Sequence, residues 1–127
     1  MSKSRKNYKL NTRHKEQSQR QLKVAQTIHA SLVECFRREG KLDYRLDGAP
    51  ISIVEVNISP DLKVANCFFV PFNTHLSIDE LLDALEESKY VIRNYITRQV
   101  NLKYSPEIRF YYDEGSENAI IVEKLLK

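Results

Sequence analysis

The sequence predicts a single α+β domain, and three observations support this prediction. The chain has 127 residues, which is the size of one ordinary domain. Its hydrophobic patterning predicts a helix, two strands, two helices, a strand and a short last helix, in that order. Helices do not alternate singly with strands, as they would in a doubly wound sheet, so helices packed on a three-stranded sheet are expected.

The first helix is predicted from residue 17 to Gly40, which is placed to end it. Apolar side chains recur in this segment at steps of three and four residues, as they do on one face of a helix. The apolar stripe runs through Leu22, Ala25, Ile28, Leu32 and Phe36. Residues 41–50 follow with turn composition and no apolar period, which indicates a loop.

Two β-branched and aromatic runs, residues 51–59 and 62–72, predict antiparallel strands joined by a tight turn at Pro60 and Asp61.

The alternation of the first strand also assigns its two faces, because successive side chains of a strand point to opposite sides. The face expected to pack against the helices carries Val54, Val56 and Ile58, and the outward face carries Glu55 and Asn57.

A capping box predicts the start of the second helix, since Ser77 is followed three residues later by Glu80. After residues 86–89 the apolar residues recur again, but at positions that do not continue the earlier helical spacing. This shift indicates a kink between two helices. Pro106 ends this helical region.

Residues 107–112 alternate apolar and polar side chains, as a half-buried strand does. Residues 117–127 carry apolar side chains at helical spacing, which predicts a short terminal helix.

The basic residues are unevenly distributed along the chain. Residues 1–45 carry 12 Lys and Arg against 4 Asp and Glu, whereas residues 46–127 carry 8 against 13. Such a basic block indicates a polyanionic partner. Residues 1–16 contain too little apolar surface to join a core, so we expect a flexible basic arm before a domain over residues 17–127.

Several classes of protein are disfavoured by composition. No apolar run approaches the roughly 20 residues of a membrane helix, so no membrane association is expected. The basic segment lacks the apolar face of a transit peptide, which favours a cytoplasmic protein. Cys35 and Cys67 lie in apolar stretches without a C-x-x-C pairing, and we expect two reduced core thiols.

Motifs for catalysis are absent from the sequence. His14, His29 and His75 are dispersed, so no metal site is expected, and His29 is predicted to be a half-buried structural residue. Three glycines leave no Gly-rich phosphate loop, and no acid, base or metal set indicates an enzyme. We therefore expect no catalytic residue, no cofactor and no small-molecule substrate.

A second basic set runs through the kink and the third helix, beside the apolar stripe. Lys89 precedes Arg93 by four residues, which makes the two neighbours on a helix, and guanidinium groups suit bidentate phosphate contacts. An ordinary solvated helix face, or helix-dipole complementation by Arg37, explains these charges as well. Arg109, on the far strand, is not expected to take part. The residues predicted to bind RNA are Arg20, Lys23, Arg37, Lys89, Arg93, Arg98 and Lys103.

Three segments, agreeing in order and spacing, resemble the bacterial ribosome-binding factor A family over roughly residues 17–127. They are RQLKV at 20–24, the hairpin ISIVEV at 51–56 with SPDLK at 59–63, and VIR at 91–93 followed by LKYSPEIRFYYD at 102–113. The resemblance implies a type II KH-like domain, α-β-β-α-α-β, without the Gly-x-x-Gly loop. Two departures are Ser88-Lys89-Tyr90 in place of the family's Ala-x-Gly kink, and Asn101 in place of a basic residue.

The resemblance also implies a function. It indicates a non-enzymatic, monomeric assembly factor that binds the immature small ribosomal subunit through its RNA and aids maturation of the end of that RNA. Contact would come from basic side chains and helix termini rather than from a glycine loop. Two alternatives stay open: a general KH-like RNA-binding protein, and an interaction module that dimerises through the sheet edge at residues 107–112.

Overall fold

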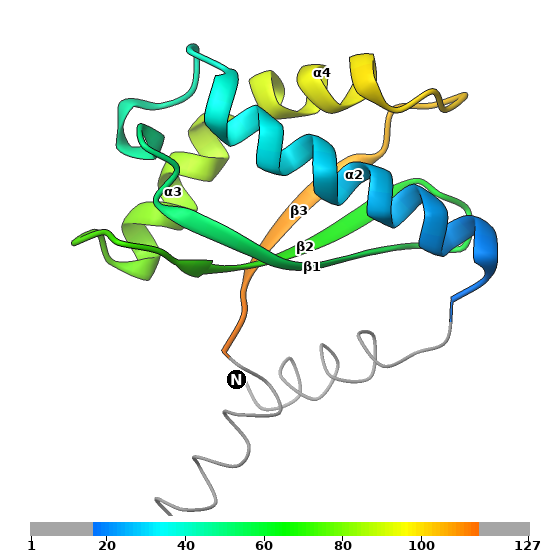
Figure 1. Cartoon of the computed structure of the whole chain (residues 1–127), viewed down its shortest axis with the longest axis horizontal. Coiled ribbons are helices and arrows are strands. Elements are labelled where there is room, and N and C mark those ends of the chain that lie inside the picture. The colour runs from blue at the N-terminus through cyan, green and yellow to red at the C-terminus, as the bar shows by residue number, and fades with distance from the viewer. Residues whose placement is uncertain (1–16, 115–127) are drawn as a thin grey trace, which may run out of the picture.

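The computed structural model describes residues 17–114 of the chain (Figure 1). The elements in order are α2 (Gln19–Arg38), the 3-10 helix η1 (Tyr44–Leu46), β1 (Ile51–Ile58), β2 (Val64–Pro71), α3 (Ile78–Glu87), α4 (Lys89–Gln99) and β3 (Glu107–Tyr112). The predicted order of helix, two strands, two helices and strand is confirmed. The predicted arm over residues 1–16 and the predicted terminal helix over residues 117–127 lie outside the described residues.

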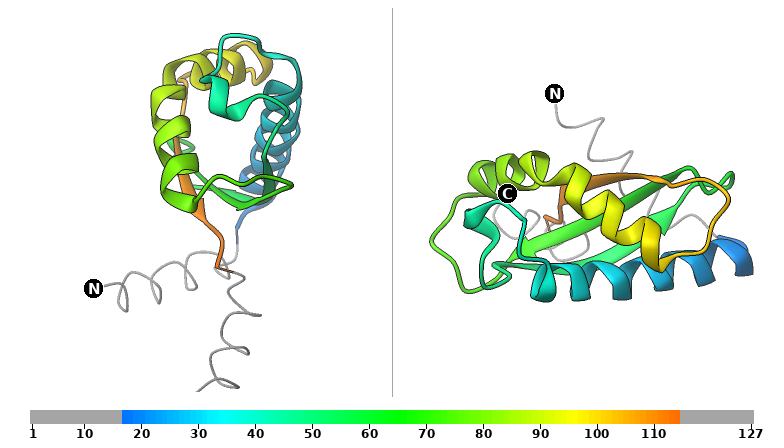
Figure 2. Two further views of the ribbon diagram at one scale, coloured as in Figure 1. Left: turned by 90° about the vertical axis from the view of Figure 1, so that its left-hand side faces the viewer. Right: turned by 90° about the horizontal axis from the view of Figure 1, so that it is seen from above.

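The described helices α2, α3 and α4 lie on one side of a three-stranded sheet (Figure 1). β2 is the central strand, antiparallel to β1 and parallel to β3. A parallel pair needs a long crossover connection, which α3 and α4 provide here. Seen from above, α3 lies across the molecule from α2, and α4 crosses toward α2 (Figure 2). The kinked helix pair is thereby placed beside β3.

The core fills the space between the sheet and the helices. Val56, Cys67 and Phe110 lie in register across β1, β2 and β3, on the face toward the helices. Ile28 of α2 and Ile96 of α4 pack over this face with no exposed surface. Removing these apolar stripes from water is the main stabilising contribution to the fold.

Three groups predicted to be structural are confirmed as such. Cys35 and Cys67 are both free and buried, and burial raises the pKa of the Cys35 thiol to about 12. A thiol with a pKa so far above neutral is protonated, and therefore unreactive, at physiological pH. His29 is half-buried, with its Nε2 atom 3.1 Å from the carbonyl oxygen of Ile53.

The predicted faces of the first strand are wrong at Val54. A β-bulge between Ile53 and Glu55 shifts the register, so that Val54 is 43% exposed while Ile53 is buried. Val56 is buried on the core face, as predicted, but Asn57, which was predicted to face outward, is also buried, and Asn66 of β2 donates to its Oδ1 at 3.2 Å. One extra residue in a strand exchanges the faces on its two sides, so Ile51 and Ile53 before the bulge share the core with Val56 and Ile58 after it.

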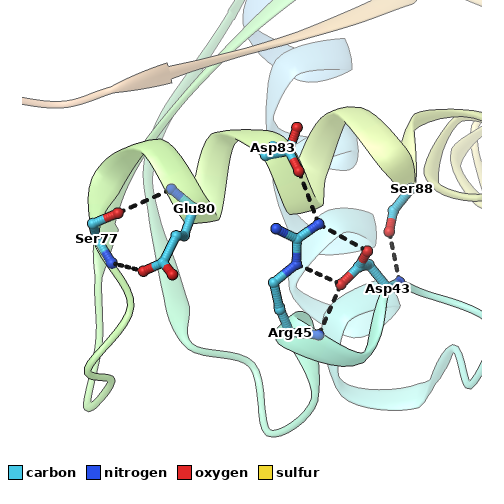
Figure 3. Close-up of polar contacts among 6 residues, drawn as sticks. All are labelled: Asp43, Arg45, Ser77, Glu80, Asp83 and Ser88. Atoms are coloured by element: carbon cyan, nitrogen blue, oxygen red, sulfur yellow. Dashed lines mark hydrogen bonds and ion pairs between the residues drawn. The ribbon is translucent and has the colours of Figure 1, made fainter.

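Capping boxes begin α2 and α3. Ser77 Oγ accepts from the Glu80 amide at 3.1 Å, and the Ser77 amide donates to Glu80 Oε1 at 2.8 Å, which confirms the predicted box (Figure 3). A second box, between Ser18 and Gln21, begins α2. The Gln21 side chain also donates to the Ile58 carbonyl at 2.8 Å, and this contact fixes the start of α2 against the end of β1.

The segment predicted as a loop contains the short helix η1. Asp43 Oδ1 accepts from the Arg45 amide at 2.9 Å and caps it, and Leu46 is buried at its end. A single buried side chain produces no periodic pattern, so this turn is not detectable from apolar spacing.

Candidate nucleic-acid interface

A groove of about 510 Å³ runs between the kinked helix pair and the edge strand β3. Leu82 and Leu85 of α3 and Ile108 and Phe110 of β3 supply its apolar part. Its polar part consists of Glu86, Lys89, Tyr90, Arg93, Glu107, Arg109 and Tyr111. The volume falls within the range of about 300–1,000 Å³ that is common for ligand-binding clefts.

Ser88 forms the kink that sets the direction of α4 relative to α3. Its hydroxyl is buried and accepts from the Asp43 amide at 2.7 Å (Figure 3). Arg45 donates to both carboxylate oxygens of Asp43, at 2.9 and 3.0 Å, and to Asp83 of α3 at 3.0 Å. The predicted kink is therefore present, and the η1 segment holds it.

Tyr90 occupies the position at which the family resemblance implies glycine. Its side chain is 69% exposed and lines the groove, so it does not obstruct the approach of the two helices. The small residue that the kink requires is Ser88, two positions earlier.

The charges of the groove are paired but carry a positive excess. Lys89 Nζ lies 2.8 Å from Glu86 Oε2, and Arg109 Nε lies 3.0 Å from Glu107 Oε2. The hydrogen bonds from Arg109 lower the pKa of Glu107, and the charges of Arg93 and Lys89 lower it further. Three cations thus face two carboxylates, and the lowered pKa keeps Glu107 ionised at neutral pH.

Arg93 anchors the segment that leads from α4 into β3. Its Nε donates to Ser105 Oγ at 3.1 Å and its Nη2 donates to the Ser105 carbonyl at 3.0 Å. Glu86 pairs with Lys89 rather than with Arg93. A guanidinium has five N–H donors, and two of them make these bonds, so Arg93 has further donors for a phosphate.

The remaining predicted RNA-binding residues are not brought to the groove. Arg98 turns toward the end of α2, 4.0 Å from a Glu39 carboxylate oxygen, and Lys103 lies 5.4 Å from the Tyr104 ring in the following loop. Arg20 and Lys23 are exposed on the first turns of α2.

Arg37 lies near the other end of α2, roughly 25 Å from Arg20 at 1.5 Å per residue. Of the seven predicted residues, the groove therefore unites Lys89 and Arg93.

Arg109 and Tyr90 are groove residues that the sequence reasoning missed. The expectation that Arg109 lies on a far strand is wrong, because the parallel pairing of β3 with β2 places β3 opposite Arg93 across the groove. The sequence did contain a signal for this side of the groove. The outward-facing residues of the alternating strand are Glu107, Arg109 and Tyr111.

The described part of the chain contains neither a membrane-spanning helix nor a cluster of metal ligands. Within residues 17–114 no helix combines the length and the apolar character that crossing a membrane requires. No three His, Cys, Asp or Glu side chains of the same residues are grouped so that they could hold a metal ion.

Comparison with known proteins identifies relatives over nearly the whole chain. A sequence profile of the family described as ribosome-binding factor A matches residues 20–126. A Rickettsia felis protein named ribosome-binding factor A is 54% identical over 113 residues, which are 89% of this chain and 94% of that protein.

Two known structures, one of them a fitted homology model, are similar in fold. A Thermotoga maritima protein described as a ribosome binding factor A, solved by NMR, has a TM-score of 0.63 and 25% identity, over 76% of this chain and 89% of its own. A Thermus thermophilus ribosome binding factor A, a homology model fitted into a cryo-EM map of its complex with the 30S subunit, has a TM-score of 0.50 and 13% identity, over 79% and 98%. These proteins have a KH-like fold, so the predicted fold class is confirmed.

Proposed function

Because the chain belongs to the ribosome-binding factor A family, we propose that it binds the small ribosomal subunit through its RNA and assists the assembly of that subunit. The family match, which spans residues 20–126, is the observation that carries this proposal. In its finer form, the protein binds the immature subunit and aids maturation of the end of the small-subunit RNA.

The groove beside β3 supports RNA as the partner. It combines exposed cations, an exposed aromatic ring and the outer edge of a strand, which are the groups that contact phosphates and bases. In this proposal Lys89 and Arg93 contact phosphates from α4, and Arg109 joins them from β3.

The other predicted basic residues act at longer range. Arg20, Lys23 and Arg37 on α2 contribute a positive field that steers a polyanion toward the protein. Arg98 and Lys103 extend the basic surface beyond the end of the groove.

The protein acts by binding rather than by catalysis, as a monomer in the cytoplasm. Hydrogen bonds from Arg109 lower the pKa of Glu107, which makes this one groove carboxyl a poor general acid. No cofactor or small-molecule substrate is needed for such a role.

One observation favours a second candidate function, an interaction module that dimerises through β3. β3 is an edge strand with half-buried aromatic side chains, and such edges can pair with another strand. The outward charges of Glu107 and Arg109 oppose this use, because charged side chains protect sheet edges from pairing.

Sedimentation tests the two candidates directly. The full chain is mixed with purified small subunits and, separately, run alone on the same gradient. Co-migration with small subunits is expected, together with a monomeric peak when the protein runs alone. A dimer that does not migrate with subunits would contradict the proposed function and support the second candidate.

A further inference from the structure

We propose that Tyr90 is a base-stacking residue, and that the β3 groove takes an unpaired RNA nucleotide rather than a duplex. The inference rests on the proposed function and deepens it, because it names the form of RNA that the groove receives. Four large aromatic side chains of residues 17–114 are strongly exposed, namely Tyr44, Phe72, Tyr90 and Tyr104, and of these Tyr90 lines the groove.

The surroundings of Tyr90 suit a nucleobase. Lys89 Nζ lies 5.6 Å from the centre of the Tyr90 ring, within the range of a cation–π contact. An ammonium group that contacts one face of a ring leaves the other face able to stack, and 69% of Tyr90 is exposed. Tyrosine rings bind unpaired bases by stacking, with little dependence on base identity.

Two cations that can contact phosphates lie within about one helical turn of the Tyr90 ring. Lys89 and Arg93 are four residues apart on α4, so their side chains are neighbours on its exposed surface. A nucleotide whose base lies on Tyr90 therefore has two cations near its phosphates. Arg109 on the opposite wall supplies a third.

The shape of the groove favours a single strand. In a duplex the faces of the bases are already covered by their stacked neighbours, and side chains meet the backbone and the shallow groove instead. Stacking on Tyr90 thus requires a base that has left the helix. A cleft of about 510 Å³ between α3, α4 and β3 has the size for a small ligand rather than for a double helix.

The experiment measures binding of the full chain to a fluorescent single-stranded RNA of about 10 nucleotides and to the same RNA as a duplex. Wild type is expected to prefer the single strand. Tyr90→Ala is expected to weaken single-strand binding by about 5- to 100-fold, whereas Tyr90→Phe keeps it, because the ring and not the hydroxyl makes the contact.

Tyr44→Ala is the matched control. Tyr44 is 77% exposed and lies 6.0 Å from the Arg45 guanidinium carbon, but it is on η1 and does not line the groove. Its substitution should leave affinity unchanged. Thermal melts of all variants should agree with wild type, since neither ring is part of the core.

The salt dependence separates stacking from charge. Tyr90→Ala should keep the wild-type slope of log affinity against log salt, whereas Lys89→Ala should reduce it by about 0.7 for a single-strand contact.

The inference is overturned if Tyr90→Ala binds the single strand as wild type does, or if wild type prefers the duplex. It is also overturned if wild type binds small subunits but not the single strand, which leaves the proposed function standing and points to a protein or duplex contact. Failure of wild type to bind small subunits would instead remove the proposed function itself.

Discussion

The two edges of the sheet, formed by β1 and by β3, carry different surfaces. At the β1 edge, a hollow of about 260 Å³ between α2 and β1 is lined by apolar side chains such as Val33 and Phe72, with Arg37 as its one charged residue. At the β3 edge, the larger groove is lined by five charged side chains and two tyrosines.

This difference shows at which edge of the sheet a polyanion can bind. Phosphates need several cations close together, and the β3 edge provides Lys89, Arg93 and Arg109 whereas the β1 edge provides Arg37 alone. The crossover through α3 and α4 creates the charged edge, because it places α4 beside the edge strand β3.

The largest expected effect tests the bulge that shapes the β1 edge. Val56→Ala removes core contacts and should lower the free energy of unfolding by about 1–3 kcal/mol. Val54→Ala, two residues away but exposed on the bulge, should change it by less than about 0.5 kcal/mol. Denaturant unfolding of both variants measures this, and equal losses would show that the bulge is absent in solution.

The next effect concerns the kink that shapes the β3 edge. Ser88→Ala removes the acceptor of the buried Asp43 amide and should cost about 0.5–1.5 kcal/mol of stability. Ser52→Ala on the exposed side of β1 is the matched control and should cost less than about 0.5 kcal/mol. If the two substitutions cost the same in thermal unfolding, η1 does not hold the kink.

The smallest expected effect is a titration inside the groove. Hydrogen bonds from Arg109 lower the pKa of Glu107 below its ordinary value of 4.5, so their stabilising contribution is present above that pH and is lost as pH falls through the lowered pKa. Bound RNA brings negative charge close and should raise the pKa of Glu107 again.

NMR titration of the side-chain carboxyl groups, with and without single-stranded RNA, measures this change. Asp43 serves as the control, because Arg45 lowers its pKa in the same way on η1, outside the groove. A change at Asp43 together with none at Glu107 would place the RNA away from the β3 edge.

Most of the fold could be predicted from local signals. The α2 stripe, the box formed by Ser77 and Glu80, and the alternation of residues 107–112 each lie within a few residues of one another, so spacing alone reveals them. The bulge at Val54 was missed, because no Gly or Pro marks it and its one sequence signal is the adjacent apolar pair Ile53 and Val54, where the alternation changes phase.

The groove was only half predictable. Lys89 and Arg93 could be found because they share one helix, whereas Arg109 reaches them only through the parallel pairing of β3 with β2. That proximity arises from topology, since 16 residues of sequence separate Arg93 from Arg109. Tyr90 stood out in the sequence only as a departure from a glycine, and its exposure at the groove became visible in the structure.

The salt dependence of binding to small subunits tests most directly that the β3 edge is the RNA-facing surface. Arg93→Ala and Arg109→Ala should each weaken binding and lower the log–log slope by about 0.7–0.9, because each removes a phosphate contact. Arg93→Lys keeps the charge but cannot reproduce the two bonds to Ser105, so it should keep the slope and thereby separate charge from loop anchoring. Arg37→Ala, an equal loss of charge at the β1 edge, should change the slope less. A wild-type affinity and slope for Arg93→Ala and Arg109→Ala, with a reduced slope for Arg37→Ala, would contradict the account and move the RNA to the α2 side of the protein.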